Sequence, residues 1–360
     1  MSKKLTAIGL MSGTSLDGID VALIYSDGKT IENPNYFLSK SYSDSLRAKI
    51  RKLIESKDRY FAKEVEREVT IAHAHAVNEF LERYNLQASD IDLIGFHGQT
   101  IDHKPDESMT WQIGDGKLLA ELAEINVVND FRSNDVREGG QGAPLVPVYH
   151  VAIMKNLPKP VAILNIGGVA NVTYIDGDDL IAFDTGTGNA MLDDLVLAAN
   201  GESCDFDGKF SEKGVVDKAI LAELMNNEYF AKMPPKSIDR NDFVDSASVL
   251  QDIYFENAAA TLIAFMAEAV ARAQEFFPQK PKAWYVSGGG RHNPTMMKEL
   301  STRLGKKIHK IEELGENGDA IEAEAFAFLA IRSFYKMPIT FSSTTGIKKS
   351  SATGGVFCPV

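Results

Sequence analysis

The chain has 360 residues, of which 44% are hydrophobic and 24% charged, so it is long enough for two domains or one large domain around a sizeable core. Its formal net charge of −12 argues against a nucleic-acid-binding role and supplies no basic patch for a membrane surface. Two distant cysteines, Cys204 and Cys358, form no disulfide framework, and no stretch approaches the roughly 20 apolar residues that span a bilayer, so we expect a cytoplasmic protein.

The first part of the chain predicts three strands in a row and then an alternation of helices and strands. Strands are expected over residues 5–12, 20–26, about 31–42, 91–96 and 125–131. Helices are expected over about 44–57, 62–86 and 116–124. This order indicates an α/β fold with a mixed sheet.

The segment between residues 136 and 147 is rich in glycine, which favours an interdomain hinge or a mobile substrate loop. The apolar stretch 145–154 after it predicts a helix. We therefore expect an N-terminal domain over residues 1–142 and a C-terminal domain over residues 143–360.

From residue 160 the plan restarts as strand, glycine turn, strand, strand, which predicts a duplicated fold. Strands are expected over 161–165, 169–175, 180–183, 283–286 and about 307–311. Helices are expected over about 247–277, 294–304 and 319–335.

Three glycine turns are candidate nucleotide-binding elements. The turn within Gly9–Asp20 joins two strands and offers backbone N–H groups and hydroxyls for a phosphate, while Asp17 and Asp20 suit a hydrated Mg²⁺. It is not the helix-opening phosphate loop, because no lysine follows and a strand comes next. A second turn contains Gly167 and Gly168, and a third, Gly288-Gly289-Gly290, lets a flat ring lie close to the backbone. Each is equally compatible with an ordinary tight turn.

Asp184 is the candidate general base. It is expected at a strand end just before a helix that begins near Asn189, where helix N–H groups stabilise an ionised carboxylate. An N-cap is the alternative, although capping does not explain the glycines at 186 and 188.

Other polar residues have both a functional and a structural interpretation. Arg132 suits a forked contact to a substrate or phosphate oxygen, or a salt bridge to Asp130 or Asp135. His97-Gly98-Gln99-Thr100 is expected at a strand end, lining a cleft or satisfying hydrogen bonds there. Asp319 to Glu322 predicts a capping box. No zinc site is expected, because His73 and His75 fall on different helix faces and no HExxH motif occurs.

The stretch Gly9–Asp20 resembles the N-terminal signature of the anhydro-N-acetylmuramic acid kinases, which belong to the sugar kinase/Hsp70/actin group of folds. The resemblance continues through Asp130-Phe131-Arg132, the run 139–147, Asp184-Thr185-Gly186 and Pro234–Ser237 to the tail at 343–346. The chain departs from the family at Thr187, where proline is usual, and at Ile238-Asp239, where Thr-Gly is usual.

The resemblance implies a two-domain ribonuclease-H-like architecture with ATP, accompanied by Mg²⁺, in the interdomain cleft. It implies catalytic roles for Asp184, as the base, and for Arg132. The implied nucleotide-binding residues are Gly13, Thr14, Ser15, Leu16, Asp17, Gly18, Ile19, Asp20, Gly167, Gly168, Asn171, Gly288, Gly289 and Gly290. The implied sugar-binding residues are His97, Gln99, Thr100, Asp135, Gly186 and Glu322.

The implied reaction opens 1,6-anhydro-N-acetylmuramic acid with water and phosphorylates O6 from ATP, giving N-acetylmuramic acid 6-phosphate and ADP in cell-wall recycling. The expected partners are therefore the sugar and ATP, with a homodimer as a family-level expectation and no nucleic acid or membrane. Two alternatives stay open: another sugar or carboxylate kinase, and a non-transferring ATPase or regulatory module of the same fold.

Overall fold

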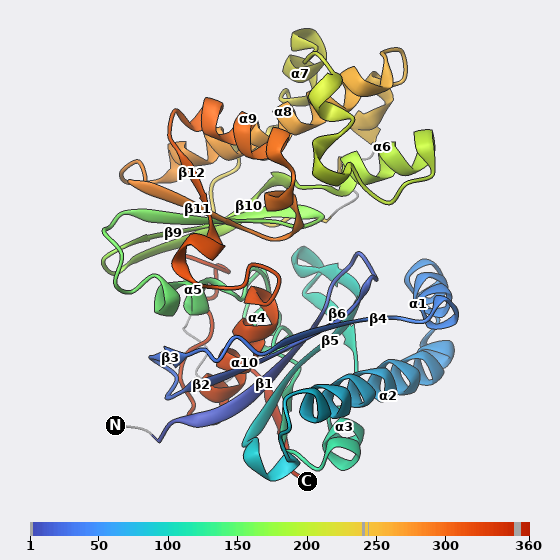
Figure 1. The fold of residues 1–360 in the computed structure, drawn as a ribbon, viewed down its shortest axis with the longest axis vertical. Coiled ribbons are helices and arrows are strands. Elements are labelled where there is room, and N and C mark those ends of the chain that lie inside the picture. Colours follow the sequence, from blue (N-terminus) through green and yellow to red (C-terminus); the bar gives the residue numbers. More distant parts are fainter. Residues whose placement is uncertain (1–2, 240–241, 244, 349–353) are drawn as a thin grey trace. The chain divides into compact units, whose positions relative to one another are not determined.

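The computed structural model describes residues 3–239, 242–243, 245–348 and 354–360. The chain divides into two compact units, Met1–Lys155 with Ala320–Val360, and Asn156–Asp319 (Figure 1). This division differs from the expected domains of 1–142 and 143–360. The first unit continues to Lys155, and the chain returns to it at Ala320.

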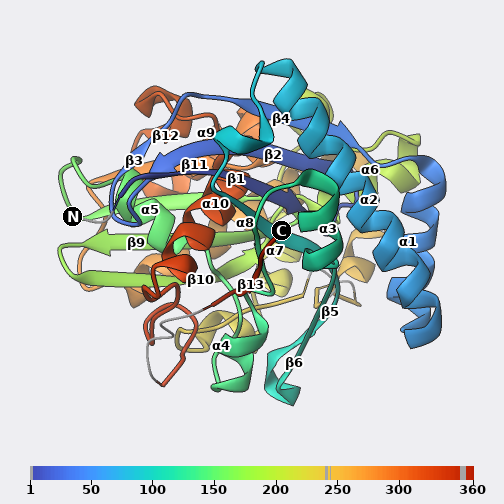
Figure 2. The ribbon, with the colours of Figure 1, turned by 90° about the horizontal axis from the view of Figure 1, so that it is seen from below.

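The first unit is built on a mixed sheet in which β1 lies between an antiparallel and a parallel neighbour. β1 pairs with β2 in antiparallel fashion and with β5 in parallel, and β5 pairs with β7 in parallel. The far half of β5 forms a hairpin with β6 (Figure 2). The strands are β1 (Leu5–Ser12), β2 (Gly18–Ser26), β3 (Ile31–Glu32), β4 (Phe37–Ser41), β5 (Leu93–Lys104), β6 (Met109–Ile113), β7 (Val127–Asn129) and β13 (Val356–Cys358).

Two strand predictions in this unit need correction. The expected strand over 31–42 is divided into β3 and β4, because Pro34 lacks a backbone N–H and Asn35 adopts a positive φ of 59°. The sequence His97–Thr100 lies inside β5 rather than at its end, since β5 continues to Lys104 alongside β6.

Helices cover both faces of this sheet. The α-helices are α1 (Asp44–Ser56), α2 (Arg59–Arg83), α3 (Gly116–Ala123), α4 (Ser133–Arg137), α5 (Pro147–Ile153) and α10 (Ile321–Phe334). Short 3₁₀ helices occur at Ala88–Asp90 and Pro105–Glu107. Ser43, Asp58 and Asp115 cap α1, α2 and α3, as expected for polar residues before apolar helices. Ile8 and Leu10 of β1 join the core cluster under α1 and α2.

The intervening residue of β1, Gly9, faces the opposite side, where α10 lies. A Cβ on Gly9 would come within 1.7 Å of the Ala323 carbonyl oxygen, and one on Gly95 within 2.1 Å of the Phe326 carbonyl oxygen. Gly9 and Gly95 are neighbours across β1 and β5. Helix α10 therefore rests directly on the two strand backbones, which is why the C-terminal segment belongs to the first unit.

The second unit repeats the strand plan of the first. Its sheet has the order β10-β9-β8-β11-β12, with β8–β9 and β9–β10 antiparallel and β8–β11 and β11–β12 parallel. The strands are β8 (Val161–Ile166), β9 (Val169–Asp176), β10 (Asp179–Thr187), β11 (Ala283–Ser287) and β12 (Ile308–Lys310). The shared plan confirms the duplicated α/β fold of the ribonuclease-H-like kind.

The buried helix α8 is the centre of the second unit's core. Its Leu262, Phe265 and Met266 pack with Trp284 of β11. The α-helices are α6 (Ala190–Asn200), α7 (Lys218–Leu224), α8 (Phe255–Ala273) and α9 (Pro294–Leu304). The 3₁₀ helices are Phe206–Gly208, Ser211–Lys213, Glu228–Ala231 (η5), Asp245–Leu250, Gln274–Phe276, Gly289–His292 and Ile311–Leu314 (η9).

The helix expected over 247–277 is shorter as an α-helix, because Tyr254 has an extended backbone and forces a new start at Phe255. Among the helices in the described ranges, none combines the length and the apolar character needed to cross a membrane.

Buried histidines make the first unit sensitive to acid. Burial lowers the pKa of His73 to about 4 and that of His150 to about 3. An unfolded histidine has a pKa of about 6.5, so the unfolded chain binds more protons between these values and stability falls as pH drops below about 6.5. The slope of the unfolding free energy against pH measures this effect. We expect His73→Leu to reduce that slope by up to about 1.4 kcal/mol per pH unit, measured by urea unfolding at several pH values.

His75→Leu is the matched control, because His75 is exposed on the same helix α2. The slope of this variant is the reference with which that of the His73→Leu variant is compared. Equal slopes for the His73→Leu variant and the wild type would contradict the prediction.

Candidate functional site

The first glycine turn is tied to the neighbouring strand β5. The Gly13 carbonyl accepts hydrogen bonds from Leu16 N at 3.3 Å and from Gln99 Nε2 at 3.1 Å. Ser12 Oγ donates to the Gly98 carbonyl at 3.0 Å. Thr14, Ser15 and Asp17 are exposed, whereas Leu16 and Ile19 pack into the core. The turn is thus fixed to β5 by hydrogen bonds, and its polar side chains are exposed.

Gln99 and Thr100 are both engaged within the first unit. Gln99 is completely buried, and its Oε1 accepts a hydrogen bond from Tyr42 Oη at 3.4 Å. Burial raises the pKa of Tyr42, which keeps this hydroxyl a donor. Thr100 Oγ1 accepts from Gln112 Nε2 at 3.3 Å. Gln99 therefore supports the glycine turn through hydrogen bonds, which is the structural one of the two roles expected for it.

Four glycines of the three turns have no explanation in packing. A Cβ on Gly13, Gly167, Gly168 or Gly289 would meet no atom closer than 3.7 Å, and none of the four has a positive φ. By contrast, a Cβ would collide with protein at Gly18, Gly288 and Gly290. Open space beside a glycine fits a ligand that approaches the backbone closely. The four positions are therefore candidates for close contact between the backbone and a ligand.

Arg132 contacts a neutral histidine. Arg132 Nε donates to His97 Nε2 at 3.0 Å, and Arg132 Nη1 donates to the Gly142 carbonyl at 2.6 Å. The other ring nitrogen of His97, Nδ1, donates to the Gly98 carbonyl at 2.7 Å. Burial, helped by the charge of Arg132, lowers the pKa of His97. These contacts orient the guanidinium.

The carboxyl group of Glu322 interacts electrostatically with Asp20 and Arg132. Burial raises its pKa, the negative charge of Asp20 raises it further, and the charge of Arg132 opposes both. The capping-box prediction is wrong: the N-cap of α10 is Ala320, without a side-chain hydrogen bond, and the Asp319 carboxylate binds Arg291 instead. The side chain of Glu322 is thus not used for capping.

Asp135, an expected sugar contact, is 1% exposed. Its Oδ2 accepts from Gly142 N at 2.7 Å, and its Oδ1 accepts from Thr345 Oγ1 at 2.7 Å. The carboxylate therefore fastens the glycine-rich loop to the C-terminal segment.

The second glycine turn is joined to the start of α6. The Gly167 carbonyl accepts from Asn189 N at 2.7 Å, and the Gly168 carbonyl accepts from Gly188 N at 2.9 Å and from Ala190 N at 3.2 Å. These three N–H groups are directed at the turn rather than at Asp184.

Asp184 lies within β10 and is held by the loop after η5. Ile238 N donates to Asp184 Oδ2 at 3.0 Å, and Asp184 N donates to the Lys236 carbonyl at 3.1 Å. Tyr229 Oη donates to the Asp184 carbonyl. Gly186, two residues on, faces Ala269 and the Phe230 ring of the core.

A row of polar residues crosses the second sheet. Asp184 pairs with Asn171, Asn171 with Asn165, and Asn165 with Ser287 in adjacent strands. Paired residues share one face of a sheet, and Ser287 Oγ donates to Asn165 Oδ1 at 3.3 Å. The sheet therefore links the candidate base to the third glycine turn. The sequence analysis did not predict this row, although Asn165, a polar residue within an otherwise apolar strand, could have indicated it.

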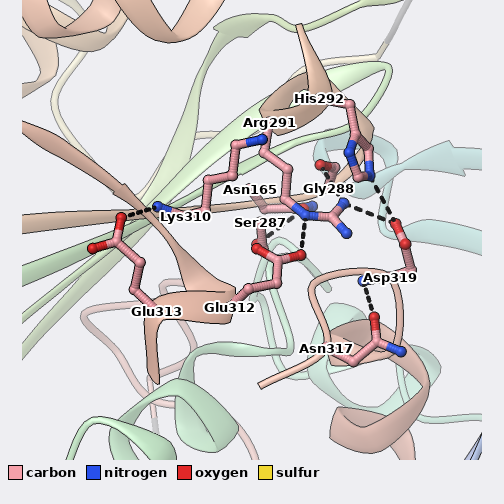
Figure 3. Close-up of polar contacts among 10 residues, drawn as sticks. All are labelled: Asn165, Ser287, Gly288, Arg291, His292, Lys310, Glu312, Glu313, Asn317 and Asp319. Carbon is pink, nitrogen blue, oxygen red and sulfur yellow. Dashed lines mark hydrogen bonds and ion pairs between the residues drawn. The ribbon is translucent and has the colours of Figure 1, made fainter. Parts of the chain in front are cut away.

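Arg291 anchors the third glycine turn (Figure 3). It is 1% exposed, and its Nη1 donates to the Gly288 carbonyl at 2.9 Å. Its Nε pairs with Glu312 at 2.6 Å and its Nη1 with Asp319 at 2.8 Å. The hydrogen bond to Arg291 is the largest cause that lowers the pKa of Asp319. Arg291 thus braces the turn through contacts within the protein itself.

Within the described residues, no group of three or more His, Cys, Asp or Glu side chains is arranged to hold a metal ion. Asp17 and Asp20 flank the first glycine turn along the chain.

The duplicated strand plan, with a glycine turn in each half, defines a protein of the sugar kinase/Hsp70/actin fold group. The chain belongs to the anhydro-N-acetylmuramic acid kinase family, whose model matches residues 5–359. It is therefore a kinase. It is 47% identical to the anhydro-N-acetylmuramic acid kinase of Zymomonas mobilis subsp. mobilis, covering 98% of this chain and 99% of the relative. It is 48% identical to that of Paramagnetospirillum magneticum, with coverage of 98% and 99%.

Among solved structures, the (R)-2-hydroxyglutaryl-CoA dehydratase component A of Acidaminococcus fermentans aligns with a TM-score of 0.49 and 13% identity. The alignment covers 91% of this chain and 98% of the other.

The Asp135 contacts lead to a stability prediction. Asp135→Asn replaces one carboxylate oxygen with an amide donor, so either Gly142 N or Thr345 Oγ1 loses its acceptor. We expect the unfolding free energy to fall by about 1–3 kcal/mol in urea titrations, the usual cost of a buried polar group left unsatisfied. Asp106→Asn, at an exposed site in the same unit, should change it by less than about 0.5 kcal/mol. Equal stabilities for the two variants would contradict this role of Asp135.

Proposed function

We propose that this chain is an ATP-dependent kinase that opens 1,6-anhydro-N-acetylmuramic acid with water and phosphorylates O6, producing N-acetylmuramic acid 6-phosphate and ADP. Family membership over residues 5–359 supports this proposal. The observation that carries the chemistry is the Asp184 carboxylate, which accepts a hydrogen bond from Ile238 N at 3.0 Å. A donor to the ionised form favours that form, which a general base requires.

In the proposed reaction, Asp184 accepts a proton from water as the water oxygen bonds to C1 of the sugar. The bond between C1 and the bridging oxygen breaks, and that oxygen, now O6, takes the γ-phosphoryl group while ADP leaves. As in glycoside cleavage, a base activates the attacking water on one side of C1 while the leaving oxygen departs on the other. Phosphoryl transfer needs mainly positioning and charge neutralisation, which glycine-turn amides provide.

The glycine turns are the proposed nucleotide-binding elements. Gly13, Gly167, Gly168 and Gly289 have room for a ligand at the position of an absent Cβ. Mg²⁺, when bound with ATP, neutralises phosphate charge, and Asp17 and Asp20 are the proposed residues that hold it or its water shell.

The sugar is proposed to contact the first unit near Arg132, His97 and Glu322. Arg132 is oriented by His97 and by the Gly142 carbonyl, and it can complement a carboxylate such as the lactyl group of a muramic acid. Glu322, with its raised pKa, suits hydrogen bonding to sugar hydroxyl groups. We place the activity in the cytoplasm, in the recycling of cell-wall sugars, because ATP is supplied there.

Asp184→Asn is the direct test of this function. It removes the proton acceptor, so we expect sugar-dependent ADP release from Mg-ATP to fall by at least about 100-fold. Release is measured with and without 1,6-anhydro-N-acetylmuramic acid. Asp179→Asn, an exposed site at the start of the same strand, is the matched control and should keep wild-type activity.

The outcomes separate the alternatives. ADP release that responds to N-acetylmuramic acid or another sugar but not to the anhydro sugar would replace the ring-opening mechanism with that of an ordinary sugar kinase. ADP release that ignores every sugar would favour an ATPase or regulatory module.

A further inference from the structure

Lys236 is a buried lysine in the second unit, with 3% of its surface exposed. Lysine is rarely buried unless its ammonium group is paired. In the described part of the chain, however, no carboxylate lies within 4.0 Å of Lys236 Nζ, so the ammonium is stabilised in another way.

Three aromatic rings and one carbonyl surround the ammonium group. Lys236 Nζ lies 4.6 Å from the ring centroids of Tyr229 and Phe276 and 5.5 Å from that of Phe183. It also donates to the Tyr229 carbonyl at 3.0 Å. Burial, with a smaller effect of Lys232, lowers the pKa of Lys236 to about 8, so the group is still mainly protonated at neutral pH. Rings and carbonyl together form a cation–π cage.

The segment that contains Lys236 holds Asp184 at three points. Asp184 N donates to the Lys236 carbonyl, Ile238 N donates to Asp184 Oδ2, and Tyr229 Oη donates to the Asp184 carbonyl. The hydrogen bond from Lys236 Nζ to the Tyr229 carbonyl joins the two ends of the segment 229–236. The cage also includes Phe183, the residue that precedes Asp184 in β10.

We propose that Lys236 is a positioning residue for the reaction: its caged ammonium holds the segment from Tyr229 to Ile238 so that Ile238 N stays on the Asp184 carboxylate. This inference rests on the proposed role of Asp184 as the base. Lys236 acts through Asp184, and its side chain is assigned no contact with the sugar or the nucleotide.

The chain supplies a matched control at Lys209. Its Nζ lies 4.6 Å from the Phe210 ring centroid in the same unit, and its side chain is 44% exposed and paired with Glu202. Lys209→Met therefore removes a surface contact between an ammonium group and an aromatic ring, at a position far from Asp184 along the chain.

The experiment is a double-mutant cycle in the sugar-dependent ADP-release assay. Lys236→Met fills the cage without a charge or a donor, and we expect kcat to fall about 10- to 100-fold, as for a misplaced catalytic group, while the KM for ATP stays within about 2-fold. Lys236→Arg keeps the charge and a donor, and it should recover part of this loss. In the Asp184→Asn background, Lys236→Met should cause no further loss of kcat, since the two residues act as a unit.

A full loss in the Asp184→Asn background, or a wild-type kcat in the Lys236→Met variant, overturns the proposal while leaving the proposed function intact. A fall in kcat that is accompanied by a rise in the KM for ATP and by a lower melting temperature overturns it as well, because that pattern describes a purely structural lysine. If Lys236→Met does not fold, Lys236→Gln, which keeps a donor without the charge, takes its place in the cycle. An inactive wild-type protein refutes the proposed function, and this inference falls with it.

Discussion

The close contact between helix α10 and the backbones of β1 and β5 organises the first unit. Gly9 and Gly95 lie side by side in the sheet, and any side chain on either would collide with a carbonyl group of the helix. Because α10 must lie there, the chain returns to the first unit after residue 319. The same placement brings Glu322, at the start of α10, within electrostatic reach of Asp20 and Arg132. A packing requirement thus assembles part of the candidate site.

In the second unit, backbone groups of the loop that contains Lys236 and Ile238 hold the candidate base. Asp184 is held by the main chain of Lys236 and Ile238. Any residue except proline at position 238 supplies the same N–H donor. The polar row from Asp184 to Ser287 continues the arrangement across four strands, and Arg291 braces the glycine turn beyond it.

Much of the candidate site could be read from local sequence, and the rest could not. Glycine turns at the ends of apolar strands identified Gly13, Gly167, Gly168 and Gly289, where the structure leaves space beside the backbone. The engagement of Gln99 with the Gly13 carbonyl, and of Asp135 with Gly142 and Thr345, depends on contacts between distant segments. A polar residue near a site has the same appearance in sequence whether it faces a ligand or supports a loop.

The sequence by itself determined the α/β plan and its duplication, because apolar periodicity and glycine turns are local properties of the chain. Its motifs, from Gly9–Asp20 onward, carried the resemblance to the family. Tertiary structure decided the division into units and the partners of Asp184 and Asp319. Asp319 shows the reason: locally it fits a helix cap, yet the buried guanidinium of Arg291 offers a charge-assisted hydrogen bond at 2.8 Å. Such competition between partners is settled by which segments meet in space.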